Sequence, residues 1–281
     1  MIVWAWLAGL LGLIIGSFLN VCIHRIPREE SVVFPRSRCP HCDATIAPYD
    51  NLPVFSYLWL GGRCRQCRAP IPLHYPLVEL LTGVVYALCA LNAPSLPLFL
   101  VSVVFATLII PLIFIDYYHY ILPDVITKPG MALGLLLSPL MPPGHWSDVL
   151  TASVYTLLNI HSLSPAWQPV VQALIGSTLG MLMGGGILWL VAEVYFRVRK
   201  REGLGLGDVK MMAMVGAFLG WKLAWFTIFL GSLVGSLYGG YLILTRGENF
   251  QYKLYFGTFL GMGALVALLY GGQFLDRYFR I

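Results

Sequence analysis

The stretch Leu96–Tyr117, LPLFLVSVVFATLIIPLIFIDY, decides the fold of this chain. It carries no charged residue before Asp116, and Ser102 and Thr107 are its only polar residues up to that point. A helix needs about 20 predominantly apolar residues to cross the hydrocarbon core of a bilayer, because each residue adds about 1.5 Å. The stretch therefore predicts a membrane-spanning helix that ends on a carboxylate.

Comparable apolar stretches recur along the whole chain. The 281 residues are 58% hydrophobic and only 11% charged, whereas soluble domains are about 25% charged. We predict an all-α polytopic membrane protein with about eight transmembrane helices and one small cytoplasmic loop domain. Asn20 and His24 at the end of the first stretch, with no A-x-A-like site after it, argue against a cleaved signal peptide. The predicted spans are residues 2–24, 76–93, 96–117, 123–141, 169–195, 208–222, 223–245 and 254–275.

The distribution of basic residues predicts the orientation of these helices. With the N-terminus outside, every Lys and Arg except Lys222, Arg277 and Arg280 falls on or near the inner side, Lys253 included, as the positive-inside rule requires. The formal net charge of +5 is then explained by orientation, and we expect no nucleic-acid partner. The long outer segment 142–168, with Trp146 and Trp167, is expected at the membrane interface.

The loop predicted to face the cytoplasm carries a paired C-x-x-C set, Cys39-Pro-His-Cys42 and Cys64-Arg-Gln-Cys67. Thiols stay reduced in the cytoplasm, so a metal is expected rather than disulfides. Four thiolates suit tetrahedral Zn²⁺, and a rubredoxin-like iron site is the alternative. Because protein ligands fill all four positions, we expect a structural site. The chain is accordingly divided into a first helix (1–24), a four-cysteine, zinc-ribbon-like domain (25–75) and a transmembrane bundle (76–281).

Ionisable groups within membrane spans are costly and mark functional sites by default. Five lie in or next to the predicted spans, all toward the inner leaflet, so that three or more could converge on one pocket: Glu79, Asp116, Asp124, Glu193 and Asp208. Simpler interpretations exist for three of them. Glu193 precedes Arg197 by four residues, a common helical ion pair. Asp124 follows a proline and suits a helix cap, and Asp208 could be a cap or pair with Lys210.

Two carboxylates that face each other share a proton, so that one is ionised while the other is protonated. The ionised member can activate water and the protonated one can donate to a carbonyl oxygen, which is the chemistry of an aspartic peptidase. Gly205 and Gly207, just before Asp208, would let a substrate backbone come close.

At these residues the chain resembles the type IV prepilin peptidases, membrane aspartic proteases of bacterial pilus and type II secretion systems. Besides the four cysteines, three stretches carry the resemblance: Gly16-Ser-Phe-Leu-Asn-Val-Cys-Ile-His-Arg-Ile-Pro27, Asp116-Tyr-Tyr-His-Tyr-Ile-Leu-Pro-Asp124 and Gly205-Leu-Gly-Asp-Val-Lys210, the last a G-x-G-D segment. One stretch departs from it, because Tyr255-Phe-Gly-Thr-Phe-Leu260 lacks expected prolines. We expect that departure to affect entry into the last helix and not the dyad.

The resemblance implies a bacterial inner-membrane enzyme with Asp116 and Asp208 as its catalytic pair. Supporting or substrate-binding roles would fall to Asp124, Gly205, Gly207, Lys210 and Glu79. The substrate would be a prepilin or pseudopilin whose basic leader is cut on the cytoplasmic side after a glycine. The resemblance also implies N-methylation of the new N-terminus with S-adenosylmethionine, for which Asn20, Arg25 and Glu79 are weak candidate residues. The oligomeric state is left open.

Two other classes of protein share parts of this pattern. A carboxylate-lined transporter would also hold acids in its spans, but those acids should be spread across the membrane depth, and no pair of repeated halves is visible. A redox membrane protein with a rubredoxin-like knot would bind iron, which metal analysis distinguishes from zinc.

Overall fold

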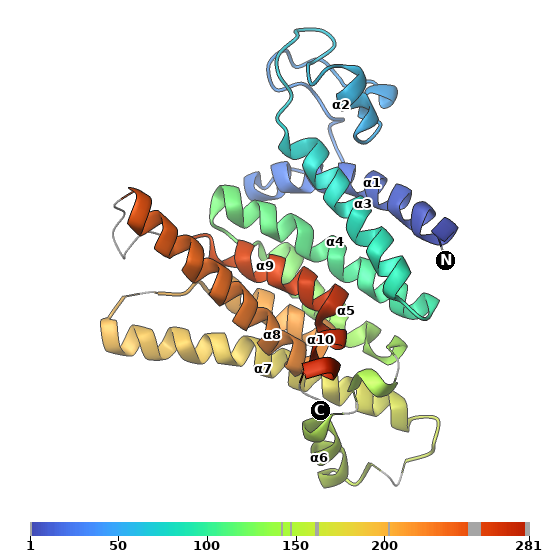
Figure 1. Cartoon of the computed structure of the whole chain (residues 1–281), viewed down its shortest axis with the longest axis vertical. Helices are drawn as coiled ribbons and strands as arrows, with labels where there is room; N and C mark the ends of the chain where they lie inside the picture. The colour runs from blue at the N-terminus through green and yellow to red at the C-terminus, as the bar shows by residue number, and fades with distance from the viewer. Residues whose placement is uncertain are drawn as a thin grey trace. The chain divides into compact units, whose positions relative to one another are not determined.

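The computed structural model describes residues 2–141, 143–146, 148–160, 163–201, 203–246 and 254–278 (Figure 1). Lys253, Arg280 and residues 142, 147, 161 and 162, on which expectations above depend, lie outside this part. Within it the chain is helical, with two isolated β-bridges and no strand. The elements are α1 Ile2–Arg25, η1 Ile26–Arg28, η2 Pro48–Asn51, α2 Phe55–Trp59, α3 His74–Asn92, α4 Leu96–His119, α5 Asp124–Leu137, η3 Ser138–Leu140, η4 Pro143–Trp146, α6 Val149–Leu157, α7 Gln168–Arg199, α8 Leu206–Arg246, α9 Phe256–Val266, η6 Ala267–Gly271 and α10 Gly272–Tyr278.

The all-α membrane fold is confirmed, although the number of spans is not. Six segments of the described chain are long and apolar enough to cross a membrane: Ile2–Arg28, His74–Asn92, Leu96–His119, Gln168–Arg199, Leu206–Arg246 and Phe256–Leu275. The predicted span 123–141 contains α5, which has only 14 residues and is too short for a perpendicular crossing. The predicted spans 208–222 and 223–245 fall together in α8.

The 41-residue helix α8 is interrupted at Gly220. Gly220 has φ 79° and ψ 171°, a conformation that only glycine adopts without strain. The residue separates an N-terminal segment, 206–219, from a C-terminal segment, 221–246. At about 1.5 Å per residue these segments are about 20 Å and about 40 Å long, so the first segment alone is shorter than the hydrocarbon core.

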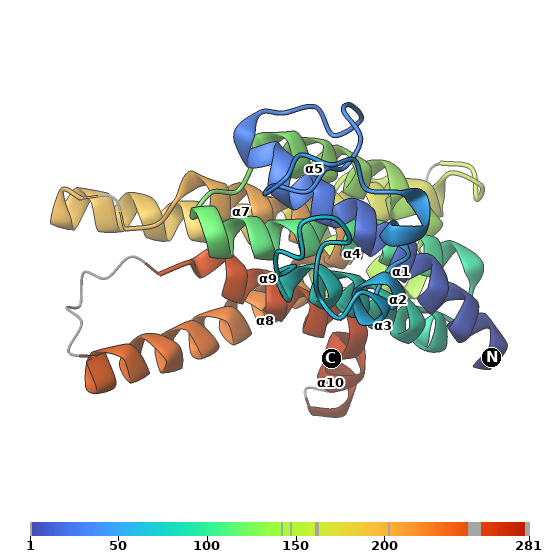
Figure 2. The same cartoon turned by 90° about the horizontal axis from the view of Figure 1, so that it is seen from above.

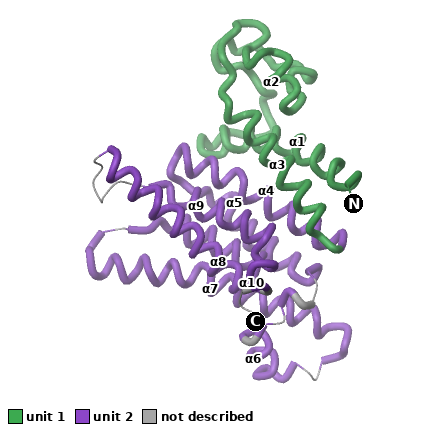
Figure 3. Tube along the Cα trace, viewed as in Figure 1, with its two compact units in different colours: residues 1–94 green, residues 95–281 purple. Residues whose placement is uncertain are grey.

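The chain forms two compact units, residues 1–94 and 95–281 (Figure 3). In unit 1, α1 packs along α3, so α3 lies with the first helix and the cysteine loop. Small residues let the two backbones approach: a Cβ on Gly16 would lie 2.7 Å from the Cα atom of Glu79. Close packing through small residues is typical of helices in membranes.

In unit 2, α4 and α8 supply most of the fully buried apolar side chains, among them Phe105, Ile109 and Leu112 of α4. The helices α7 and α8 pack against each other, and Figure 2 shows the C-terminal end of α8 diverging from α7. A Cβ on Gly180 would overlap the carbonyl oxygen of Gly216, so only glycine fits where these backbones touch.

The position expected for Trp146 is wrong. Trp146 is 1% exposed and its indole Nε1 donates a hydrogen bond to the carbonyl oxygen of Ser138 at 3.2 Å. The ring packs where a side chain on Gly176 would otherwise be, 2.5 Å from that position. Trp146 is therefore a core residue of unit 2, whereas Trp167 is exposed.

Candidate functional site

Asp116 lies in the last turn of α4 and is 5% exposed. Thr258, in the first turn of α9, donates two hydrogen bonds to its Oδ2 atom, from the backbone N–H at 2.7 Å and from Oγ1 at 3.1 Å. A Cβ on Gly257 would lie 3.1 Å from the same carboxylate. The start of α9 can therefore press its backbone against Asp116 because residue 257 has no side chain.

Asp208 lies in the first turn of α8 and is 8% exposed. Its backbone N–H donates to the carbonyl oxygen of Gly205 at 3.1 Å. The neighbouring Gly207 and the Gly257 that contacts Asp116 both face the side chain of Leu122, 2.9 Å from the position of each Cβ, so Asp208 lies near Asp116. The Oδ1 atom of Asp208 is buried and has no hydrogen-bond partner among the described residues.

Two buried carboxylates that interact in this way are unusual, because burying one charge without a cation is already expensive. Sharing a single proton removes one of the two charges and leaves an acid beside a base. Such a pair can activate a water molecule and protonate a carbonyl oxygen. The two side chains also differ, since Asp116 Oδ2 accepts two donors and Asp208 Oδ1 accepts none among the described residues.

Asp124, the third carboxylate of this region, is engaged in ion pairs. It is the first residue of α5, and its oxygens lie 2.6 Å from Lys210 Nζ and 2.7 Å from Lys128 Nζ. Lys210 follows Asp208 on α8, so the pair ties the start of α5 to the start of α8. Pro123 holds the cap position of α5, and the helix-cap interpretation of Asp124 is not needed.

The two glycines of the G-x-G-D segment have different surroundings. Gly207 faces Leu122, whose Cβ would be 2.9 Å from a side chain at that position. Gly205 has Asp208 Oδ2 at 3.4 Å from the position of a Cβ. Gly207 is thus used for close packing within the chain. Glu193 pairs with Arg197 at 2.7 Å, the ordinary helical ion pair.

Aromatic rings surround the entry into α9. Tyr255 contacts Tyr117, Tyr238 and Phe259 with ring centroids 4.9 Å, 5.8 Å and 5.5 Å away, and its hydroxyl donates to that of Tyr238 at 2.7 Å. These contacts fix the residue that precedes α9.

Thr258 and Gly257 are the site residues that sequence reasoning missed. The departure at Tyr255–Leu260 was expected to touch helix entry and not the dyad, and that expectation is wrong because this segment contacts Asp116 directly. The missing prolines were the only signal in the sequence. The contact itself joins residues 142 positions apart and is made largely by a backbone N–H.

In unit 1 the four cysteines of the paired set come together. Their sulfur atoms all lie within 4.8 Å of one another, and those of Cys39 and Cys67 are 3.7 Å apart. Zn–S bonds of about 2.3 Å in a tetrahedron place the sulfurs about 3.8 Å apart. The four side chains therefore fit a tetrahedral metal ion. Cys22 and Cys89 are buried elsewhere in the helices of this unit.

The two halves of the cysteine centre repeat each other, and the sequence analysis did not identify this repeat. Residues 39–46, CPHCDATI, and 64–71, CRQCRAPI, form matching turns. In each, the first cysteine N–H donates to the alanine carbonyl oxygen at 2.9 Å, and the residue after the second cysteine has a positive φ. The backbone N–H groups of Cys67 and then Gln66 lower the pKa of the Cys64 thiol to about 6, which favours the thiolate that a metal requires.

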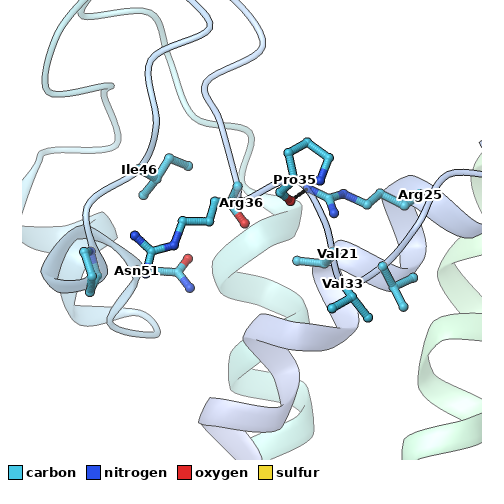
Figure 4. Close-up of a pocket in the computed structure, with 10 residues that line it drawn as sticks. Val21, Arg25, Val33, Pro35, Arg36, Ile46 and Asn51 are labelled. Carbon is cyan, nitrogen blue, oxygen red and sulfur yellow. Dashed lines mark hydrogen bonds between the residues drawn. The ribbon is translucent and has the colours of Figure 1, made fainter.

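The three weak candidates for a methyl-donor site line one cavity of about 540 Å³ in unit 1. Asn20 donates from Nδ2 to the carbonyl oxygen of Tyr75 at 3.0 Å, and its Oδ1 atom is buried with no partner in the described chain. Glu79 accepts the backbone N–H of Val54 at 2.8 Å. Arg25 donates to the carbonyl oxygens of Ser31 and Pro35 at 2.8 Å and 2.7 Å, beside a smaller pocket (Figure 4).

Comparison with known proteins agrees with this arrangement. The family model "Bacterial Peptidase A24 N-terminal domain" matches residues 10–93, and "Type IV leader peptidase family" matches residues 102–240. A "Prepilin leader peptidase/N-methyltransferase" of Aeromonas hydrophila is 34% identical over 96% of this chain and 91% of its own length.

The chain belongs to the type IV leader peptidase family. A relative with the same name from Pseudomonas aeruginosa is 32% identical over 96% of this chain and 91% of the relative. One from Myxococcus xanthus is 37% identical over 85% of this chain, which spans 63% of that longer protein. No solved structure matches the chain significantly. Both matched family regions stay within one unit each, the first in unit 1 and the second in unit 2.

Proposed function

We propose that this chain is a membrane aspartic endopeptidase that removes the leader of type IV prepilins or type II secretion pseudopilins, and that it N-methylates the new N-terminus. Cleavage follows a glycine on the cytoplasmic side of the bacterial inner membrane, the side to which the basic residues assign the cysteine loop. Asp116 and Asp208 are the catalytic pair. The observation that carries this proposal is the burial of two interacting aspartates in unit 2.

The mechanism follows from a pair that holds one proton. The ionised aspartate takes a proton from water while the water oxygen bonds to the scissile carbonyl carbon, and the protonated aspartate donates to the carbonyl oxygen. The tetrahedral intermediate then collapses: the C–N bond breaks, the amine leaves with the proton of the dyad, and one hydroxyl of the intermediate returns a proton to the dyad as the new carboxyl group forms. No covalent enzyme adduct forms.

The other residues of the G-x-G-D region position Asp208. Lys210 and Asp124 join the start of α8 to the start of α5 through an ion pair at 2.6 Å. Gly207 lets Leu122 pack against the residue before Asp208, while Gly205 accepts the Asp208 backbone N–H. These contacts hold the first turn of α8 in place, and Gly205 leaves its face open for a substrate backbone.

The cysteine centre is proposed to hold a structural zinc ion through Cys39, Cys42, Cys64 and Cys67. Four protein thiolates leave no coordination position for a substrate, so the ion would supply folding energy to the loop rather than chemistry. Metal analysis of the purified protein would separate zinc from the iron of a rubredoxin-like site.

For methyl transfer, S-adenosylmethionine would supply an electrophilic methyl group when bound. The cavity of about 540 Å³ in unit 1 lies within the usual size of small-molecule sites. Asn20 Oδ1 is a buried acceptor without a partner in the described chain and can take a ligand N–H or O–H. Arg25 and Glu79 already hold backbone groups of the loop, so they would shape the cavity more than bind the ligand.

A prepilin cleavage assay in liposomes tests the catalytic pair. Asp116→Asn and Asp208→Asn should each abolish cleavage while the protein still elutes and unfolds as the wild type does. Glu193→Gln is the matched control, because it also removes an acid near a span but one paired with Arg197. Full cleavage by either aspartate variant would remove that residue from the mechanism.

A further inference from the structure

We propose that Thr258 is a positioning residue that keeps Asp116 in its carboxylate form, so that Asp116 accepts the proton of water and Asp208 carries the proton of the pair. This inference rests on the proposed peptidase function and assigns the two roles that the function alone leaves open. Thr258 does not touch the reacting atoms; it acts through Asp116.

The first argument is the difference between the two carboxyl groups. Asp116 Oδ2 accepts the Thr258 backbone N–H at 2.7 Å and faces its hydroxyl at 3.1 Å. Donors to a carboxylate stabilise the ionised form and are stronger than donors to a neutral oxygen. The Asp208 carboxyl has a single backbone donor, from Gly205, and its Oδ1 atom is buried without a partner in the described chain. A buried oxygen without a donor costs less in a neutral carboxyl group than in a carboxylate. The proton of the pair therefore belongs on Asp208.

The second argument is where the Thr258 N–H comes from. Thr258 is in the first turn of α9, where backbone N–H groups lack a partner four residues back and carry part of the positive end of the helix dipole. The N–H also donates to the carbonyl oxygen of Tyr255 at 3.2 Å, so it is shared between that oxygen and the closer Asp116 Oδ2 at 2.7 Å. The single hydroxyl proton is shared between Asp116 Oδ2 and the carbonyl oxygen of Ile113, each at 3.1 Å, and these contacts hold α9 against the C-terminal part of α4.

The third argument is that the backbone donor requires a residue other than proline at position 258. A proline at position 258 would have neither the N–H nor the hydroxyl, and the family resemblance leads us to expect prolines in this segment. The ring of a proline would restrict the backbone at the start of α9, whereas here the aromatic contacts of Tyr255 hold this segment in place. The chain thus replaces a stiff helix entry with one that donates to Asp116.

Three variants at one position separate the contributions of the two donors. Thr258→Ser keeps both donors, Thr258→Val removes the hydroxyl, and Thr258→Pro removes both. Proline suits the first turn of a helix, and the preceding residue, Gly257, tolerates the conformations that a following proline imposes. We therefore expect each variant to fold. The proline Cδ would take the place of the N–H hydrogen that points at Asp116 Oδ2, so Thr258→Pro also displaces the carboxylate, and Thr258→Val is the cleaner test.

The readout is the pH dependence of prepilin cleavage by the full chain in liposomes. Losing donors makes Asp116 easier to protonate, so the acid limb of the rate profile moves to higher pH. The acid limb should be unchanged for Ser, displaced by an intermediate amount for Val and displaced most, by roughly one pH unit, for Pro. The plateau rates of Ser and Val should stay within about threefold of wild type. The apparent pKa of the acid limb belongs to the pair of carboxyl groups as a whole. A displacement of the limb can therefore be measured without assigning that pKa to one residue.

Controls separate failure of this inference from failure of the function. Thr227→Val removes another buried hydroxyl that bonds a carbonyl oxygen in its own helix, and its profile should match wild type. If Asp116→Asn and Asp208→Asn are inactive, the function stands. The role of Thr258 is then overturned if the Val and Pro profiles superimpose on wild type, or if their plateau falls with no displacement of the acid limb.

Discussion

Replacing Glu79 by leucine should release the cysteine loop from α3. Glu79 is 8% exposed, and its Oε2 atom accepts the backbone N–H of Val54 at 2.8 Å. Val54 has φ 62° and ψ −47°, and the Phe55 N–H donates to the carbonyl oxygen of Pro53 at 2.6 Å across it. This is a γ-turn of the strained kind, on a β-branched residue, and it costs about 1–3 kcal/mol.

The magnitude follows from the bond that offsets this strain. A hydrogen bond to a charged acceptor contributes about 1.5–3 kcal/mol. Losing about 2 kcal/mol makes local opening roughly 30-fold more frequent. Glu79→Gln keeps an acceptor oxygen without the charge. Local opening in this variant should therefore be roughly fivefold more frequent than in the wild type, between the wild type and Glu79→Leu.

Amide hydrogen exchange of the peptide that contains residues 53–59 measures the effect. Thr82→Val is the control, because it alters another buried polar group on α3, one that donates to the Val78 carbonyl oxygen within its own helix. Val54→Gly relieves the strain, so in that background Glu79→Leu should accelerate exchange less, a coupling that a double-mutant cycle reports. The reasoning is refuted if Glu79→Leu leaves exchange of this peptide unchanged, or accelerates it no more than elsewhere in the loop.

Three further outcomes are expected. Cys64→Ser should lower the bound metal, measured by elemental analysis, from one ion per chain to near zero and make the loop protease-sensitive, while strong metal retention would contradict the four-thiolate site. Asp124→Asn should lower the thermal midpoint more than Lys210→Met, because it leaves two lysines without their shared anion; the reverse order would exclude this network. Gly180→Ala should destabilise the protein by about 3 kcal/mol or more through overpacking. Gly186→Ala, whose added methyl group meets nothing within 4 Å, should be neutral or stabilise the protein by up to about 1 kcal/mol. Equal effects of the two variants would contradict the α7–α8 contact.

The sequence predicts the parts of this molecule that depend on local pattern. Apolar stretches predict the helices, and the confirmed family follows from motifs such as the G-x-G-D segment at Asp208. The number of spans is less accessible, because the break at Gly220 depends on one residue's φ among many glycines that stay helical. The 14-residue helix α5 likewise looks like a span only when the turns after it are counted.

Contacts between elements that are distant in the sequence determine the positions that sequence reasoning did not predict. Thr258 donates to Asp116 mainly through a backbone N–H, which every residue except proline possesses, so the residue type alone gives no indication. Trp146 looked like an interfacial aromatic by composition, but Gly176 leaves room for its ring in the core. Both positions are decided by which helix packs opposite, and no local pattern encodes that.

The matching turns 39–46 and 64–71 have a consequence for where the loop can change length. Each turn contributes two sulfurs, so a bound ion would act as a cross-link that closes the intervening segment into a ring. The entropy of closing such a ring rises only with the logarithm of its length, at about 0.6 kcal/mol for each doubling. Gly61, at φ 60° with nothing within 4 Å of a Cβ, marks a tip in that segment. A label or short tag inserted after Gly61 should therefore leave the ring closed and its stability almost unaltered.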